Sequence, residues 1–160
     1  MGLDMYLKAN TYVSKYDYSK RNDDNEPQVT QKFKDTLVAF PELNTGDIYG
    51  FEVARVVCYW RKANAIHNWF VENVQSGEDN CAEYRVSRDD LQQLRTEIKQ
   101  VLDNRDKADE ILPTTSGFFF GSTDYDEWYF GDLEHTLEFL NEALDTDRFS
   151  EYDFYYQASW

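Results

Sequence analysis

DIYGFEVARVVCYWRKANAIHNWF, residues 47–70, changes its hydrophobic period halfway along, and this change predicts the centre of the fold. Over residues 47–60 apolar side chains occupy both alternating faces, which predicts an interior β-strand. Beyond this point the spacing becomes helical, with Ile66, Trp69 and Phe70 on one face. The stretch therefore predicts a strand that is followed directly by a helix.

Other parts of the chain show the same two periods. Alternating side chains and β-forming residue types predict strands over residues 3–13, 82–86 and 152–160. Helical spacing predicts one helix after Ser87 and another from about Tyr125 to Leu144. Residues 31–40 fit a short helix or a short strand, and their period does not separate the two.

The two longer predicted helices carry signals at their ends. Ser87 begins S-R-D-D, a variant of the capping box in which Asp90 replaces the usual Glu or Gln. Either Ser122 or Thr123 is placed to cap the helix near the C-terminus. Gly131 interrupts that helix, so the sequence predicts a kink or two shorter helices there.

These elements predict a single α+β domain over residues 1–160, with an antiparallel or mixed sheet and about three helices packed on it. A chain of this length can bury a core of its own. The polar and charged stretch at about 17–30 predicts a mobile loop. TTSGFFFGST, residues 114–123, predicts a short buried strand with loop ends.

The chain is strongly acidic, with 31 Asp and Glu against 16 Lys and Arg and a formal net charge of −15. Affinity for nucleic acid comes mainly from cations at phosphates, so we expect no direct binding of DNA or RNA. Between Thr123 and Asp153 there are eleven acids and one base. This region predicts a surface for a basic partner protein. Its members are Asp124, Asp126, Glu127, Trp128, Glu134, Glu138 and Glu142.

The junction between the predicted strand and helix gathers cations, amides and a histidine in this acidic chain. Cations and donors at a helix N-terminus are the ingredients of an anion site. The other interpretation is that the cations pair with the protein's own acids, while His67 and the amides are solvated or cap loops. The ligand-binding candidates of the junction are Trp60, Arg61, Lys62, Asn64, His67 and Asn68.

The 114–123 segment places three phenylalanines between two glycines, with hydroxyls on both sides. Such a segment can let the backbone approach a phosphate or a nucleobase, but it lacks the lysine of a P-loop. The same pattern fits a core strand with turns made by glycine. Its ligand-binding candidates are Ser116, Gly117, Gly121 and Ser122.

The sequence indicates no metal site, no cofactor and no covalent catalysis. Cys58, His67, Cys81 and His135 lack the paired spacings of a zinc site, and no nucleophile motif is present. A histidine beside a carboxylate remains able to act as a general acid or base. The apolar surroundings of Cys58 predict a buried thiol in a reducing cytoplasm. The sequence contains no apolar run of the kind that predicts a signal peptide or a membrane span.

Three stretches carry a resemblance to a known family: MGLDMYL at 1–7, YWRKANAIHNWFVENVQ at 59–75 and LPTTSGFFFGSTDYDEWYF at 112–130. They resemble a family of small proteins encoded by bacteriophages and prophages. The family brings no established activity and no catalytic residues with it. The resemblance implies a phage accessory protein that works in the cytoplasm of a bacterial host.

Together these features predict a non-enzymatic protein that binds and neutralises a host component. The partner would be a basic host protein, for example a defence or nucleic-acid-binding protein, or a small nucleotide-like anion. The alternative is an enzyme acting on a nucleotide or another phosphorylated small molecule, with Arg61 and Lys62 as anion clamps and His67 as acid or base. The many aromatic residues also suit a homodimer contact.

Overall fold

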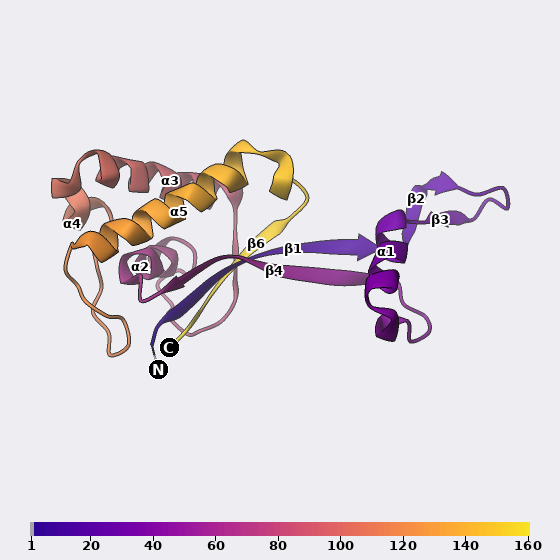
Figure 1. The fold of residues 1–160 in the computed structure, drawn as a ribbon, viewed down its shortest axis with the longest axis horizontal. Helices are drawn as coiled ribbons and strands as arrows, with labels where there is room; N and C mark the ends of the chain where they lie inside the picture. The colour runs from indigo at the N-terminus through magenta and orange to yellow at the C-terminus, as the bar shows by residue number, and fades with distance from the viewer. Residues whose placement is uncertain (1) are drawn as a thin grey trace. The chain divides into compact units, whose positions relative to one another are not determined.

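The computed structural model describes residues 2–160 and shows an α+β protein, which confirms the predicted fold class (Figure 1). Its contacts gather in two compact units. The larger unit comprises the N-terminal residues up to Ala9 together with Arg55–Trp160, and the smaller unit is Asn10–Ala54. Two strands, β1 and β4, belong in part to each unit.

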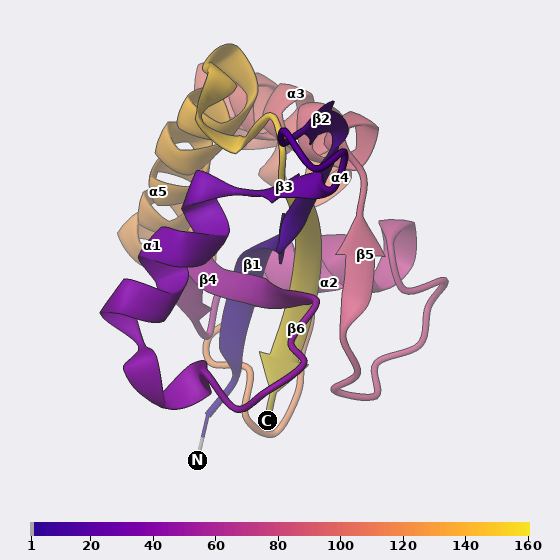
Figure 2. The same cartoon turned by 90° about the vertical axis from the view of Figure 1, so that its right-hand side faces the viewer.

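The larger unit is built on a four-stranded antiparallel sheet in the order β4-β1-β6-β5. Figure 2 shows β1, β6 and β5 side by side in it. The strands are β1 (Asp4–Ser14), β4 (Gly50–Arg61), β5 (Tyr84–Val86) and β6 (Asp153–Ser159). Alternate residues of β1 and β6 are buried. One face of the sheet therefore contributes to the core, as in other sheets covered on one side.

Helices supply the rest of this core. They are α2 (Asn64–Asn73), α3 (Arg88–Asp103), α4 (Ala108–Ile111) and α5 (Glu127–Asp145), with the 3-10 turns η2 (Arg105–Lys107) and η3 (Asp147–Phe149). At the centre the ring of Phe70 on α2 stacks on that of Tyr156 on β6, with 4.0 Å between the ring centroids. Both side chains are fully buried, so α2 is held against the middle of the sheet.

The helix ends confirm one predicted cap and correct another. Ser87 and Asp90 form both hydrogen bonds of the capping box at the start of α3. Asp126, rather than Ser122 or Thr123, caps α5 by accepting from the backbone N–H groups of Trp128 and Tyr129. The helix begins later than predicted because an aspartate next to the first turn can accept two of its free amides.

Gly131 does not divide the helix in two, since α5 runs as one helix from Glu127 to Asp145. A Cβ added at this glycine would meet no atom within 4 Å. The position is therefore exposed, and the helix tolerates the glycine because packing on its other face fixes the backbone.

The smaller unit contains a hairpin where the sequence predicted a mobile loop at about 17–30. Strand β2 (Tyr16–Arg21) pairs antiparallel with β3 (Pro27–Val29). Asn22 closes the turn, with its side-chain oxygen accepting from the N–H groups of Asp24 and Glu26. Most residues of this ribbon are exposed, so no apolar alternation reveals its strands in the sequence.

Residues 31–40, which the sequence left between helix and strand, form helix α1 (Gln31–Ala39), followed by the 3-10 turn η1 (Pro41–Leu43). Thr30 caps α1 by accepting from the N–H of Phe33. The Phe33 ring stacks on Phe51 of β4, with 5.0 Å between the ring centroids. This stacking supplies the burial that favours a helix here.

Two further predictions are wrong. Strand β4 is an edge strand, not an interior one. Its apolar residues have different surroundings: Cys58 is buried in the core, whereas Val53 and Val56 are 39% and 49% exposed. Residues 114–123 form a loop instead of a buried strand, and Phe118 in it is 95% exposed. Gly121, with φ of +87°, helps to turn this chain back in a way that a strand does not allow.

Candidate functional site

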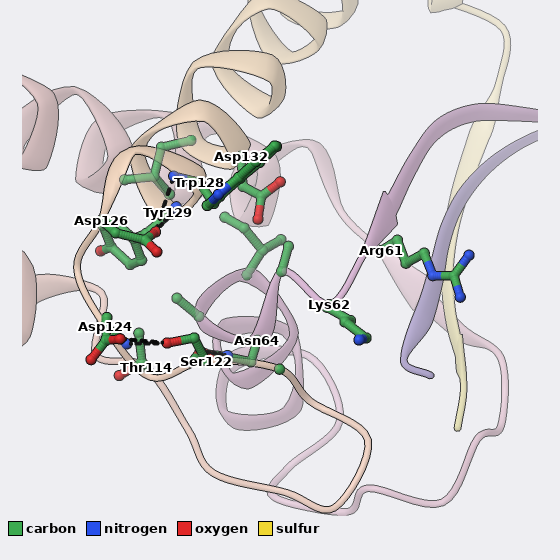
Figure 3. A pocket seen from close by; sticks show the side chains of 15 residues that line it. Arg61, Lys62, Asn64, Thr114, Ser122, Asp124, Asp126, Trp128, Tyr129 and Asp132 are labelled. Atoms are coloured by element: carbon green, nitrogen blue, oxygen red, sulfur yellow. Dashed lines mark hydrogen bonds between the residues drawn. The ribbon is translucent and has the colours of Figure 1, made fainter. Parts of the chain in front are cut away.

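A cavity of about 330 Å³ lies in the larger unit, where three segments meet. Its wall is formed by the β4–α2 junction, by the loop that contains Gly121 and Ser122, and by the first turns of α5 (Figure 3). A volume of this size falls in the range of small-molecule sites. The cavity is therefore the candidate site.

The start of helix α2 forms one wall of the cavity. Its N-cap residue, Ala63, has no side chain that can accept a hydrogen bond. The N–H of Asn64 bonds to the Lys62 carbonyl, but the N–H groups of Ala65 and Ile66 find no acceptor among residues 2–160. Free amides at a helix N-terminus carry partial positive charge and attract anions. This wall can therefore bind an oxyanion.

Lys62 lies between strand and helix instead of in the first helical turn, where the sequence placed it. Its backbone adopts φ of +63°, a left-handed conformation that is costly for a lysine. The chain is held there by the Lys62 N–H, which donates to the Leu3 carbonyl at 2.8 Å. Gly121 packs against it, since a Cβ on this glycine would lie 3.2 Å from the Lys62 Cβ.

Arg61 is the last residue of β4, and its side chain points away from the cavity in Figure 3. In the described part of the chain neither Arg61 nor Lys62 forms an ion pair with an acid. The interpretation that both cations serve internal pairs therefore has no support there. Both residues border the cavity, and Lys62 is the nearer of the two to the start of α2 along the chain.

Asn64 has a positioning role. Its amide nitrogen donates to the carbonyls of Phe120 at 3.1 Å and Ser122 at 2.7 Å. Its amide oxygen accepts from the N–H of Thr115 at 3.1 Å. The side chain is buried, with 4% exposed. Asn64 thus joins both arms of the loop to α2, and its hydrogen-bonding groups are used by the protein itself.

The opposite wall carries three carboxylates and an indole (Figure 3). Asp126 caps α5, and Asp124 accepts from the hydroxyl of Ser122 at 2.9 Å. Asp132 accepts no hydrogen bond at its carboxylate from any residue that the structure describes, and burial raises its pKa to about 6. Trp128 is 85% exposed beside it. An exposed indole at a cavity offers a flat surface for an aromatic ligand.

His67 lies outside this cavity, although the sequence grouped it with Lys62. It is buried, with Nδ1 2.8 Å from the Tyr156 hydroxyl and Nε2 3.1 Å from Asp79 Oδ2. With Asp79 ionised, Nε2 carries the hydrogen and Nδ1 accepts from Tyr156. Trp160 also donates to Asp79, at 3.0 Å. The histidine therefore holds three segments together.

The predicted ligand-binding residues divide between two places. Lys62, Asn64, Gly121 and Ser122 line the candidate cavity, and Arg61 borders it although its guanidinium group points away. A separate, more open groove is lined by His67, Asn68, Ser116 and Gly117, together with the three phenylalanines at 118–120. Trp60 belongs to neither of these two. It is buried in the core and donates to the Thr136 hydroxyl at 2.8 Å.

Sequence reasoning missed some residues of the cavity, chiefly Thr114, Ala65, Tyr129, Asp132 and Leu133. Asp132 had a recognisable signal, because it follows Trp128 by four residues on a predicted helix and so shares its face. The others could not be found, since their positions depend on how the loop returns to α2. Cys58 is no nucleophile here, as burial raises the pKa of its thiol to about 12.

The predicted partner surface lies on and just before α5. Its members are exposed: Asp124, Asp126, Glu127, Trp128, Glu134, Glu138 and Glu142. Arg105 lies within ion-pair distance of Glu127 and Glu134, and Arg148 pairs with Glu142. Such exposed pairs are weak, so this face stays available to a stronger cationic partner. Asp124, Asp126 and Trp128 also line the cavity.

Comparison with known proteins found no matching family model, no matching curated protein and no matching solved structure. Within residues 2–160, no three His, Cys, Asp or Glu side chains come together as a metal site would require. None of the helices that the structure describes has the length and apolar character needed to cross a membrane.

Proposed function

We propose that this protein is a phage-type accessory protein, non-enzymatic, that captures a small nucleotide-like anion of its bacterial host in the cavity between α2 and α5. The observation that carries the proposal is the combination of free helix amides and an unpaired lysine on one wall with an exposed indole on the other. A phosphate fits the first wall and a nucleobase the second.

The resemblance to phage proteins supports the setting, which is the bacterial cytoplasm. The charge of the chain supports a small ligand over a nucleic-acid strand, because a net charge of −15 repels a polyanion. A single phosphate interacts mainly with the charges close to it, since salt screens the more distant ones. The left-handed backbone of Lys62 supports the same site, since strain of this kind is often retained where a side chain must be presented to a ligand.

The test uses the two neighbouring cations as a matched pair. We expect Lys62→Gln to weaken binding of a nucleoside monophosphate by about tenfold, because it removes a charged hydrogen-bond donor from the phosphate. Arg61→Gln should change the affinity by less than about twofold, because its side chain points away from the cavity. Isothermal titration calorimetry of the full chain measures both. Equal losses in the two variants would contradict the proposed phosphate wall.

A second matched pair tests the indole. Trp128→Ala should weaken the same ligand by about tenfold through lost stacking. Phe118→Ala is the control, because this ring is 95% exposed and lies outside the cavity. Unchanged affinity in Trp128→Ala, or a comparable loss of affinity in Phe118→Ala, would contradict stacking of the ligand on the Trp128 indole.

A second candidate function is binding of a basic host protein by the acidic face of α5, favoured by the exposure of Trp128 beside Glu127. The double variant Glu134→Lys/Glu138→Lys should then abolish capture of that partner, whereas Lys62→Gln should leave it intact. The opposite result would exclude this surface. The enzymatic alternative placed Lys62 and His67 at one site, but the two line different cavities.

A further inference from the structure

The surroundings of Asp132 in the candidate cavity oppose the charge of its carboxylate. Burial raises the pKa of its carboxyl group, the charge of Asp126 raises it further, and only His135 acts in the opposite direction. Its carboxylate oxygens find no hydrogen-bond donor in the part of the chain that the structure describes. A half-buried acid without donors costs folding free energy, so its presence in a cavity points to donors that arrive with a ligand.

The other two acids of the cavity are already used by the protein. Asp126 accepts from two backbone amides at the start of α5, at 3.0 and 3.1 Å. Asp124 accepts from the Ser122 hydroxyl. Of the three, Asp132 alone has a carboxylate that accepts no hydrogen bond from residues 2–160. The contrast within one cavity indicates that Asp132 has a role that the other two do not share.

Asp132 is also well placed beside the stacking surface. It follows Trp128 by four residues on α5, so the two side chains occupy neighbouring positions on one face of the helix. Both line the cavity, and Figure 3 shows them on the wall opposite the start of α2. A flat ring that lies on the indole would thus bring its edge to the carboxylate.

We propose that Asp132 is the specificity-determining residue of the cavity and that it selects a nucleobase with two adjacent N–H donors on its edge, as in guanine. This inference rests on the proposed capture of a nucleotide. The carboxylate accepts from the ring imino N–H and the exocyclic amino group together, as a paired contact. The phosphate of the same ligand lies at the free amides of α2, next to Lys62.

The edge of adenine does not suit this carboxylate. Adenine presents an amino donor beside a ring nitrogen that is an acceptor, so one carboxylate oxygen would face a lone pair. A site that leaves a buried polar group unpaired rejects the wrong ligand strongly. Discrimination by one paired contact of this kind is on the order of tenfold or more.

The experiment compares guanosine monophosphate with adenosine monophosphate by isothermal titration calorimetry at pH 7.5, using the full chain. We expect the wild type to bind the guanine nucleotide at least about tenfold more tightly. In Asp132→Asn the preference should fall to about twofold or reverse, because the amide offers one donor and one acceptor, which matches adenine. Asp89→Asn is the matched control, because this exposed acid lies outside the cavity, and it should keep the preference of the wild type.

The outcomes separate the two proposals. Equal affinity of the wild type for the two nucleotides, or an unchanged preference in Asp132→Asn, overturns the role of Asp132 while nucleotide capture stands. Absence of binding for both nucleotides overturns nucleotide capture together with this inference. Loss of affinity for both nucleotides in Asp132→Asn without a change in their ratio shows a general structural role and also overturns the inference.

Discussion

Replacement of Asn64 by alanine is expected to lower the free energy of unfolding by about 3 kcal/mol and to release the loop that closes the cavity. The substitution removes three hydrogen bonds at once and leaves the carbonyls of Phe120 and Ser122 and the N–H of Thr115 without their partner. Each such bond contributes about 1 kcal/mol. Urea unfolding measures the loss, and amide hydrogen exchange at Thr115 reports the release of the loop.

The control is one helical turn away. Asn68 is the same residue type on the same helix, is half buried and makes no side-chain hydrogen bond within residues 2–160. We expect Asn68→Ala to change the free energy of unfolding by less than about 0.5 kcal/mol. A similar loss in both variants would mean that the loop is held by its phenylalanines and not by the Asn64 amide.

Asn64→Asp is expected to lower the free energy of unfolding as well. It keeps the shape of the side chain, but replaces the amide donor with a charged oxygen that faces two carbonyls. The loss should therefore be larger than that of the alanine variant. A milder effect of aspartate than of alanine would contradict the assigned orientation of the amide.

Asp132→Asn is expected to stabilise the protein by about 2 kcal/mol at pH 7.5, less than the full pKa shift would give, because solvent screens the partly exposed carboxyl. The pKa of this carboxyl is about 6 in the folded state, against an ordinary value of 3.8. Between these two values the folded state holds more protons than the unfolded state, so stability falls as the pH rises through this window. Below it both states are protonated, and above it the penalty is constant. Asparagine carries no charge and avoids the penalty.

The measurement is urea unfolding of both proteins at several values between pH 4 and pH 8. The difference between variant and wild type should grow from near zero at the acidic end to its full value above about pH 6.5. Asp124→Asn, at an exposed acid that already has a hydrogen bond, should show no such gain. Destabilisation by Asp132→Asn at pH 7.5 would show that the carboxylate has a stabilising partner in the folded protein.

Asn64 and Asp132 are expected to contribute to the stability of the protein in opposite directions, although both line one cavity. Asn64 stabilises the fold and positions the wall, whereas Asp132 is expected to destabilise the fold and to serve the ligand. Acids kept at a cost in stability are a recognised feature of binding and active sites. If Asp132→Asn raises stability and also removes the base preference, both results follow from the same carboxylate.

The sequence by itself was sufficient for what depends on neighbouring residues. The change of period at the β4–α2 junction, the capping box at Ser87 and the helix after Asp126 are all local patterns, and the α+β class follows from them. It also indicated cations at the junction, because charge is a property of residue type. The hairpin at 16–29 escaped it, since an exposed ribbon has no apolar alternation to detect.

The tertiary structure decided what depends on distant residues. Asn64 reaches the loop 56 and 58 positions along the chain, and His67 meets Tyr156, 89 positions away. Those contacts assign His67 to one cavity and Lys62 to another, although the two are only five positions apart in sequence. The local sequence pattern does not predict such contacts, because they form only when helix, loop and sheet pack together in the folded core. The edge position of β4 and the unpartnered carboxylate of Asp132 became visible only for this reason.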